Sequence, residues 1–380
     1  MSVTADGSPE AVPKSAPVRV RETTRIPELD SLRGLGALAI LAFHLWPATF
    51  FLGWSRVDLF FVMSGYLITT INLKYGGERG FLLKFYLRRI LRTWPAYFAV
   101  VAVVCLIGLG NGRLPRVDAL AYHLTFTQNT SYYWSGDPPR LDRLLLHTWC
   151  LAIEEQFYLL WPALMMAVGV RKLLPLSVWL IISSVMLRAS GLHPWTLAAR
   201  CDGLGLGAIL AVALREGEWD RNRMRAMRIT FASLSGVAAV GIIVLYSPIF
   251  SAVSTGQTFS QPLSPVESLM ILFVSTFYTG LVALVVCHSG QRGLRVLRTK
   301  ALCYIGRISY GIFLCHFVVI GLISEWYAST GQPARMGLGI FVLCILVGAL
   351  SWEVLEKPLA NLKRYLPYRS YELSIRPAHG

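Results

Sequence analysis

Apolar residues recur along this chain in ten long runs that short polar segments separate. Each run has nearly the length that a helix needs to cross a bilayer, about 20 residues, although some are slightly shorter. The runs cover residues 34–54, 57–73, 94–111, 147–170, 174–192, 201–214, 229–250, 266–288, 301–323 and 336–354. The pattern predicts an all-α fold: a polytopic membrane helix bundle with about ten transmembrane helices.

Composition agrees with a membrane protein and excludes an ordinary soluble domain. Hydrophobic residues make up 54% of the 380 positions and charged residues only 15%. The seven cysteines lie within or beside the apolar runs, and none forms a Cys-x-x-Cys motif. We therefore expect them to pack in helices, with neither a disulfide framework nor a metal site.

The two ends of the chain differ from the apolar runs. Residues 1–25 are rich in Pro, Ser, Ala and charge, and they lack the apolar core of a cleavable signal peptide. This composition predicts a disordered cytosolic tail. We expect residues 26–362 to form the membrane domain and residues 363–380 to form a second cytosolic tail.

Basic residues predict the orientation of the bundle. With the N terminus in the cytosol, the inner segments hold 25 of the 36 Lys and Arg residues and the outer loops hold 7. Short cytoplasmic loops retain Lys and Arg, so both termini are expected to be cytoplasmic. The net charge of +15 then reflects topology. We expect no nucleic-acid partner.

Arg33 and His44 are polar residues at the two ends of an apolar stretch in the first run. Eleven helical steps bring their side chains to within about 20° of each other, with about 16 Å of rise between them. Titratable groups in a membrane helix usually face a protein interior or an aqueous cavity. The pair is therefore a site hypothesis. The alternative is that Arg33 snorkels to the interface and His44 is a hydrogen-bonded packing residue.

The predicted topology sorts other polar residues by depth. Outward-running helices carry His44 and His316 to the outer half, and inward-running helices begin with Asp58 and His147 near the outer surface. Glu154 lies about 10 Å deeper than His147 on the same helical face. The outer half of the bundle is therefore expected to be rich in acid and base groups.

A basic segment lies at the opposite, cytosolic surface. It contains Arg88, Arg89 and Arg92, and Arg88 and Arg92 are four residues apart on one helical face. Such a surface suits a polyanion, and the phosphates of coenzyme A fit it. The alternative is a topogenic loop that binds anionic lipids.

Seven motifs give the chain a resemblance to a known family. They are RIPELDSLRGLGALAILAFHLWP, VDLFFVMSGYLIT, RRILRTWPAY, LLHTWCLAIEEQFYLLWP, CDGLGLGAILA, YIGRISYGIFLCH and LEKPL. In this order and spacing, over about residues 25 to 362, the chain resembles the acyltransferase 3 family of integral-membrane O-acyltransferases. The resemblance implies an enzyme of the bacterial inner membrane that transfers an acyl group, commonly acetyl from cytosolic acetyl-CoA, to a hydroxyl of an extracytoplasmic glycan or other acceptor.

The family motifs also imply which residues form the site. The Arg, ten residues, His signature falls on Arg33 and His44. The other motif residues are Asp58 and Ser64, Arg88, Arg89 and Arg92, and Glu154 and Tyr158. Many relatives carry an additional SGNH-type domain, and we expect this chain to be a stand-alone membrane form. In that case the bundle finishes the reaction alone or passes the group to a separate protein.

Chemistry suggests a role for each residue. An imidazole can remove the proton of a sugar hydroxyl during attack on a thioester, so His44 is the expected general base. A transient acyl-imidazole on His44 is an alternative. Glu154 or Asp58 is expected to orient His44. We expect acyl-CoA contacts from Arg33, Ser64 and the basic segment, and acceptor contacts from His147, His316 and Tyr158. The alternatives are an interfacial role for His147 and a helix-joining hydrogen bond for His316.

Polar residues inside a helix bundle are also compatible with a different class of function. Transporters and flippases of lipid-linked glycans also need polar groups inside a bundle. No internal repeat relates the two halves of the chain, which favours the enzyme. An inactive scaffold is a third alternative, and the presence of both Arg33 and His44 disfavours it. The acceptor and a homo-oligomeric state are not determined by the sequence.

Overall fold

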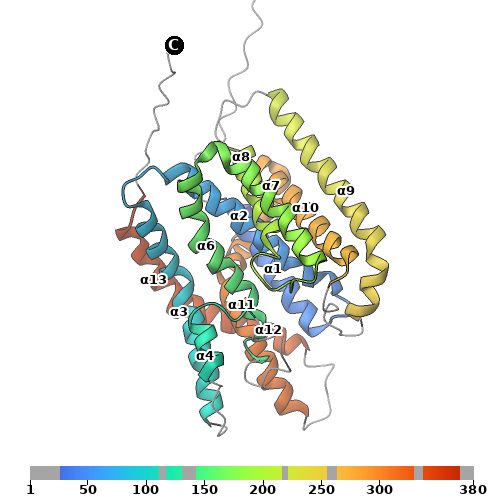
Figure 1. Cartoon of the computed structure of the whole chain (residues 1–380). Helices are drawn as coiled ribbons and strands as arrows, with labels where there is room; N and C mark the ends of the chain where they lie inside the picture. Colours follow the sequence, from blue (N-terminus) through green and yellow to red (C-terminus); the bar gives the residue numbers. More distant parts are fainter. Residues whose placement is uncertain are drawn as a thin grey trace, which may run out of the picture.

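A computed structural model describes residues 26–110, 117–130, 143–215, 221–254, 263–328 and 337–368. These residues are mostly helical and include no β-strand, which confirms the predicted all-α bundle (Figure 1). The predicted tail of residues 1–25 lies outside the described residues, and so do residues 369–380 of the C-terminal tail.

Each of the ten apolar runs corresponds to one helix. These helices are α1 (Pro27–Leu45), α2 (Arg56–Tyr75), α3 (Phe81–Gly110), α6 (Trp149–Val168), α7 (Leu173–Ala189), α8 (Cys201–Ala213), α9 (Arg221–Ser254), α10 (Pro265–Cys287), α11 (Lys300–Ala328) and α12 (Gly337–Ser351). Shorter elements are α4 (Val117–Leu124), α13 (Lys357–Asn361), the 3-10 turns η1 (Phe51–Ser55), η3 (Leu146–Thr148), η4 (Val170–Lys172), η5 (Arg292–Arg298) and η8 (Leu362–Tyr365), and the π-helical turn η7 (Trp352–Glu356).

Among the described residues, eight helical segments are long and apolar enough to cross a membrane. The two other predicted spans, α8 and α1, do not meet these criteria of length and apolar composition. Helix α8 has only 13 residues, and α1 carries Glu28, Asp30 and Arg33 in its first turns. The number of ten spans and the cytoplasmic position of both termini stay predictions.

The first helix is displaced from its predicted run of residues 34–54. It begins at Pro27, where the fixed φ of proline suits the first helical position. It ends at Leu45, because Pro47 disfavours the helical conformation in the residue before it, and Trp46 leaves the helix with φ −138° and ψ 66°. His44 therefore lies in the last turn of α1.

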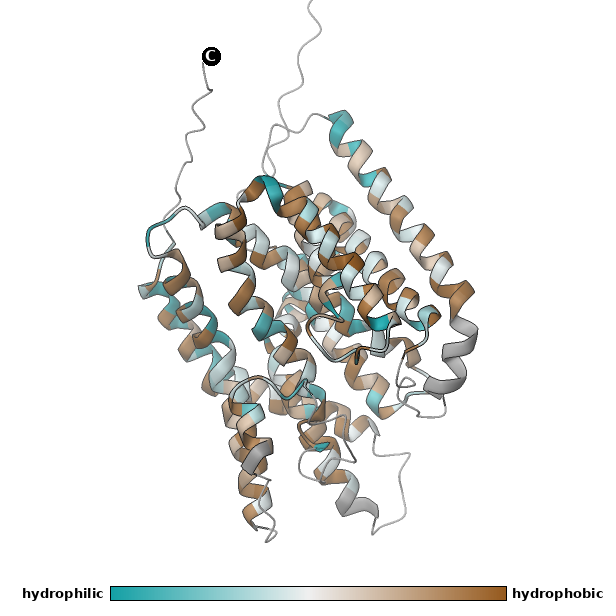
Figure 2. Ribbon diagram, in the orientation of Figure 1, coloured by the Kyte–Doolittle hydropathy of each residue, from teal (hydrophilic) through white to brown (hydrophobic). Residues whose placement is uncertain are grey.

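Large apolar side chains cover the outside of the bundle. On α9, Val237 is 66% exposed and Ile243 is 73% exposed, and Leu106 on α3 is 65% exposed. Helix α9 lies at one edge of the bundle against α10 (Figure 1), and apolar residues predominate along most helices (Figure 2). An apolar surface of this extent suits contact with lipid.

Two glycine contacts bring α1 and α11 very close together. A Cβ at Gly306 would lie 2.0 Å from the backbone oxygen of Asp30, and a Cβ at Gly34 would lie 2.7 Å from the nitrogen of Gly306. Small residues allow this approach of helix backbones. His44 follows Gly34 by ten residues, and His316 follows Gly306 by ten residues. Because both offsets have the same sign, the two helices run parallel with their histidines in register.

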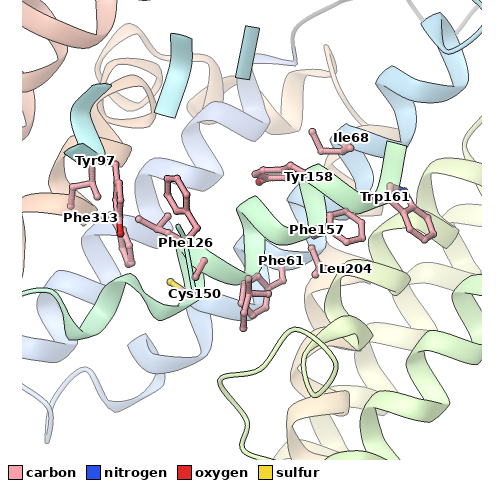
Figure 3. Packing of buried hydrophobic residues seen from close by; sticks show 14 of the residues in the cluster. Phe61, Ile68, Tyr97, Phe126, Cys150, Phe157, Tyr158, Trp161, Leu204 and Phe313 are labelled. Atoms are coloured by element: carbon pink, nitrogen blue, oxygen red, sulfur yellow. The ribbon is translucent and has the colours of Figure 1, made fainter. Parts of the chain in front are cut away.

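A similar contact joins α2 to α8. A Cβ at Gly65 would lie 2.1 Å from the oxygen of Leu204, and a Cβ at Gly207 would lie 2.1 Å from the oxygen of Val62. This contact explains the glycines of two of the sequence motifs. Helix α2 also packs against α6, whose Phe157 and Trp161 rings stack at 5.2 Å in the core (Figure 3).

Candidate active site

Three histidines from separate elements meet at the C-terminal end of α1. The ring centres of His44 and His316 lie 5.3 Å apart, and those of His147 and His316 lie 4.7 Å apart. Phe317 contacts both His44 and His147 at 4.7 Å. We call His44, His147 and His316 the histidine cluster. Predicted depth had placed all three in the outer half, and the structure brings them into contact.

The three imidazoles differ in exposure. His44 is exposed, whereas His147 is 6% exposed and His316 is 1% exposed. The Nδ1 of His316 is 2.5 Å from the backbone oxygen of Phe313. His316 Nε2 and both ring nitrogens of His147 are buried without a hydrogen bond. Buried nitrogens of this kind carry a desolvation cost and retain full capacity to bond a partner. His44 is thus the accessible base, with two buried imidazoles behind it.

Glu154 lies at the centre of a second group, the carboxylate cluster of Ser64, Arg89, Glu154, Glu155 and Tyr158. Ser64 donates a hydrogen bond to Glu154 Oε1 at 2.8 Å, and the Tyr158 hydroxyl donates to Glu154 Oε2 at 3.1 Å. Ser64 and Tyr158 are also 2.6 Å apart. The predicted residues Ser64, Glu154 and Tyr158 are therefore brought together, but around a carboxylate rather than around His44.

Arg89 is the cation of the carboxylate cluster. Its guanidinium lies 4.0 Å from Glu154 and 3.7 Å from Glu155, and 3.5 Å from the centre of the Tyr158 ring. Thr93 and Trp94 donate two further hydrogen bonds to Glu155, at 3.0 and 3.2 Å. Because Arg89 joins α3 to α6, its charge is already used in assembling the bundle.

Asp58 is part of a buried ion-pair network instead of a pair with His44. Arg200 and Ser275 each donate to Asp58 Oδ1 at 2.9 Å. Asp202 lies nearby and accepts from Arg188 at 2.6 Å. Asp58, Arg188 and Asp202 are at most 1% exposed. Among the residues that the structure describes, no hydrogen bond or ion pair joins either predicted orienting carboxylate, Glu154 or Asp58, to His44.

Arg88 binds the end of the described chain. Its Nη1 donates to the backbone oxygens of Lys363 and Leu366, at 3.0 and 2.8 Å, and its guanidinium lies 4.7 Å from the centre of the Tyr368 ring. Tyr368 stacks on Tyr75 at 4.7 Å. Burial in this contact raises the pKa of Tyr368 to about 12, so its phenol stays neutral. The surrounding contacts give Arg88 a structural role.

Arg33 and Arg92 differ from Arg88 and Arg89. Within the described parts of the chain, neither makes an ion pair or a side-chain hydrogen bond. The two are near enough for their positive charges to repel each other, and the ammonium of Lys363 is also near enough to Arg92 for such repulsion. Asp30 and Glu356 act on Arg92 from beyond ion-pair distance. We call Arg33, Arg92 and Lys363 the basic cluster.

Sequence reasoning missed three members of these groups. Lys363 was assigned to a cytosolic tail, and only its fold back onto α3 reveals its place near Arg92. Arg200, which no sequence argument singles out, pairs with Asp58. Glu155 is adjacent to Glu154 in EEQFY, and this doubled acid was the available signal. No group of three or more potential metal ligands occurs among the described residues.

Comparison with known proteins gives the family. A family model described as an acyltransferase domain matches residues 26–355. The chain belongs to this family of acyltransferases. Its helices and its family together identify the acyltransferase as a membrane protein. No solved structure matches the chain.

Three curated relatives match the chain over part of their own length. The putative peptidoglycan O-acetyltransferase YrhL of Bacillus subtilis (strain 168) is 31% identical over 363 residues, 88% of this chain and 55% of the relative. The peptidoglycan O-acetyltransferase OatA of Listeria monocytogenes serovar 1/2a is 29% identical over 373 residues, 90% of this chain and 57% of the relative. The putative O-acetyltransferase SACOL0978 of Staphylococcus aureus (strain COL) is 27% identical over 357 residues, 88% of this chain and 57% of the relative. The chain therefore spans little more than half the length of these relatives.

Proposed function

We propose that this acyltransferase moves an acetyl group from cytosolic acetyl-CoA to a hydroxyl of a cell-envelope glycan. The observation that carries the proposal is the arrangement along α1. The basic cluster includes Arg33 in its second turn, and the histidine cluster includes His44 in its last turn. These two residues are separated by about 16 Å of rise. An extended thioester arm can cover this rise with its phosphates at one end and its acetyl group at the other.

Phosphate binding is assigned to the basic cluster of Arg33, Arg92 and Lys363. Guanidinium groups bind phosphate through charge-assisted hydrogen bonds, and a cation without an ion-pair partner is available for them. Arg88 and Arg89, which the sequence had placed in the same role, instead hold the C-terminal turn and the carboxylate cluster. Ser64 and Tyr158, which the sequence assigned to acyl-CoA and to the acceptor, both bond Glu154.

His44 is assigned as the general base. It takes the proton of the acceptor hydroxyl while the oxygen attacks the acetyl carbonyl. A C–O bond forms, the C–S bond breaks, and the coenzyme A sulfur leaves as a thiolate that receives the proton from His44. The exposure of His44, in contrast to the burial of His147 and His316, supports this choice.

The acceptor is proposed by chemical class. Two relatives are named for peptidoglycan O-acetylation, which makes a peptidoglycan glycan the first acceptor to test. The aromatic residues Trp149 and Trp195 stack at 5.6 Å beside the start of α6, on the same side of the bundle as His147. Partly exposed rings of this kind suit the apolar faces of a sugar.

The test uses purified protein in nanodiscs, isotopically labelled acetyl-CoA and peptidoglycan fragments. Mass spectrometry should detect a labelled acetyl ester on the glycan with wild-type protein and none with His44→Ala. An acetyl adduct on His44 in the absence of acceptor would replace direct transfer by the two-step route. Movement of a lipid-linked glycan across proteoliposomes without any acetyl transfer would overturn the proposal in favour of a transporter.

A further inference from the structure

We propose that His316 is the positioning residue for His44. In this proposal His316 Nε2 accepts a hydrogen bond from one ring nitrogen of His44, which leaves the other ring nitrogen aimed at the acceptor hydroxyl. The inference rests on the proposed function, because it assumes that His44 is the base. It gives to an imidazole the orienting role that Glu154 or Asp58 was expected to play.

The hydrogen bond to the helix backbone fixes the tautomer of His316. A carbonyl oxygen can only accept, so the 2.5 Å contact with Phe313 means that His316 Nδ1 carries the proton. In the neutral ring Nε2 is then an acceptor with a free lone pair. This atom is buried without a partner, and His44 is one of the two side chains with ring nitrogens that contact the His316 ring.

The separation of the rings fits one hydrogen bond. Two imidazoles joined by an N···N distance of about 2.9 Å, with about 1.1 Å from each ring centre to its nitrogen, have centres about 5.1 Å apart. The centres of His44 and His316 are 5.3 Å apart, and the rings are tilted by 36°. A small ring rotation therefore completes the bond, as is common when a catalytic site closes on its substrate.

The backbone contact between α1 and α11 maintains this juxtaposition. Gly34 and Gly306 hold the two helices in register, and each histidine follows its glycine by ten residues. The positions of both rings therefore follow from rigid helices and not from loops. Pre-organisation of this kind is what a positioning residue has to supply.

The two carboxylates that were expected to orient His44 have other hydrogen-bond partners. Glu154 bonds Ser64 and Tyr158, and Asp58 bonds Arg200 and Ser275. The titratable groups whose charges act most strongly on His316 are His147 and His44. A neutral imidazole can stabilise the proton that His44 acquires during attack, and it avoids the cost of leaving a buried carboxylate without a partner.

His147 is assigned to the rear wall of the site. Its ring stacks on Phe317 at 4.7 Å with an angle of 23°, and it contacts Phe313 at 5.1 Å. These contacts hold it against the His316 ring and keep solvent from the Nε2 lone pair. Of the two imidazoles beside His316, only that of His44 is exposed, so His44 is the donor assigned to His316 Nε2.

The experiment compares four variants in the acetyl-CoA assay. His316→Leu removes the acceptor, and His316→Asn keeps a donor near Phe313 but does not reach the Nε2 position. Both should lower kcat by about tenfold or more, with an acetyl-CoA KM within twofold of wild type. His316→Gln places an amide oxygen near the Nε2 position and should restore kcat to within about threefold of wild type. Ile320→Val, a packing change on the same helix outside the histidine cluster, is the control and should also stay within about threefold.

Two results would overturn the assignment of His316. One is a wild-type kcat in His316→Asn or His316→Leu, and the other is a folded His316→Gln that is as inactive as His316→Asn. If His316 only holds helices together, the three His316 variants should lose thermal stability. The kcat of their folded fraction should then equal that of wild type. Failure of the proposed function has a different signature, because wild-type protein would then transfer no acetyl group, or His44→Ala would transfer it normally.

Discussion

Two pairs of arginines in this bundle differ in how the protein treats their charge. Arg188 and Arg200 are buried, and each donates to an aspartate at 2.6 or 2.9 Å. Arg33 and Arg92 make no ion pair within the described residues, although they lie near each other and Lys363 lies near Arg92. Under the proposed function, the paired arginines serve assembly and the unpaired ones are available for a ligand.

Breaking the buried ion pair between Arg188 and Asp202 should give the largest effect on stability. Arg188→Met leaves Asp202 as a buried charge without its partner, which typically costs about 3–5 kcal/mol. We expect little folded protein in detergent extracts, measured by size-exclusion chromatography and thermal unfolding. The double variant Arg188→Met/Asp202→Leu removes both charges and should recover most of the folded protein. Equal stability of the single variant and wild type would show that the pair has no role in assembly.

The glycine contact should give the next largest effect. Gly306→Ala places a Cβ 2.0 Å from the backbone oxygen of Asp30, so α11 must shift away from α1. Such overpacking typically costs about 1–3 kcal/mol. Because the same shift separates His44 from His316, the kcat of the folded fraction should also fall by about tenfold.

Gly339→Ala is the matched control for this glycine. A Cβ at Gly339 meets nothing within 4 Å, and alanine favours a helix interior over glycine by up to about 1 kcal/mol. Its stability and activity should equal or exceed those of wild type. If Gly306→Ala behaves in the same way as Gly339→Ala, the register of α1 and α11 does not position the histidines.

The unpaired arginines should give a smaller and more selective effect. Arg92→Ala should raise the acetyl-CoA KM by about tenfold, equivalent to about 1.4 kcal/mol, and leave the thermal stability near that of wild type. The effect should be greater at low than at high ionic strength, because salt screens exposed charges. A normal KM together with altered membrane insertion would instead identify Arg92 as a lipid-binding residue.

Arg88 should give the smallest effect on catalysis. Its guanidinium bonds the backbone oxygens of Lys363 and Leu366, so Arg88→Ala should loosen the C-terminal turn and lower stability by about 0.5–1.5 kcal/mol per hydrogen bond. The acetyl-CoA KM should change less than in Arg92→Ala. Kinetics and thermal unfolding on the same preparations decide this, and a larger KM effect for Arg88→Ala would return that residue to the phosphate site.

The sequence predicted the helices well because hydrophobic periodicity is a local property. Ten runs became ten helices, and the errors were at ends, such as the stop of α1 before Pro47. Predicted depth also placed His44, His147 and His316 in the outer half of the bundle. Depth alone did not reveal that their rings meet, because the register between helices is set by backbone contacts at Gly34 and Gly306, which leave no periodic signal.

Partner choice was the least predictable part of the site. The predicted depths of Glu154 and Asp58 suit a contact with His44. In the structure, however, Glu154 forms an ion pair with Arg89 and Asp58 forms one with Arg200. Likewise, three arginines in one motif have three different environments, since Arg88 meets the C-terminal turn, Arg89 meets carboxylates and Arg92 meets neither. Such differences depend on contacts between residues 60 or more positions apart.

The most direct test of the account is thermal unfolding of the purified protein with and without coenzyme A. A ligand at 100 times its Kd stabilises the folded state by about 2.7 kcal/mol. Wild type and Arg88→Ala should therefore unfold at a higher temperature when coenzyme A is present, and the double variant Arg33→Ala/Arg92→Ala should be folded but show little or no increase. An undiminished increase in that double variant would contradict the claim that the unpaired arginines form the coenzyme A site.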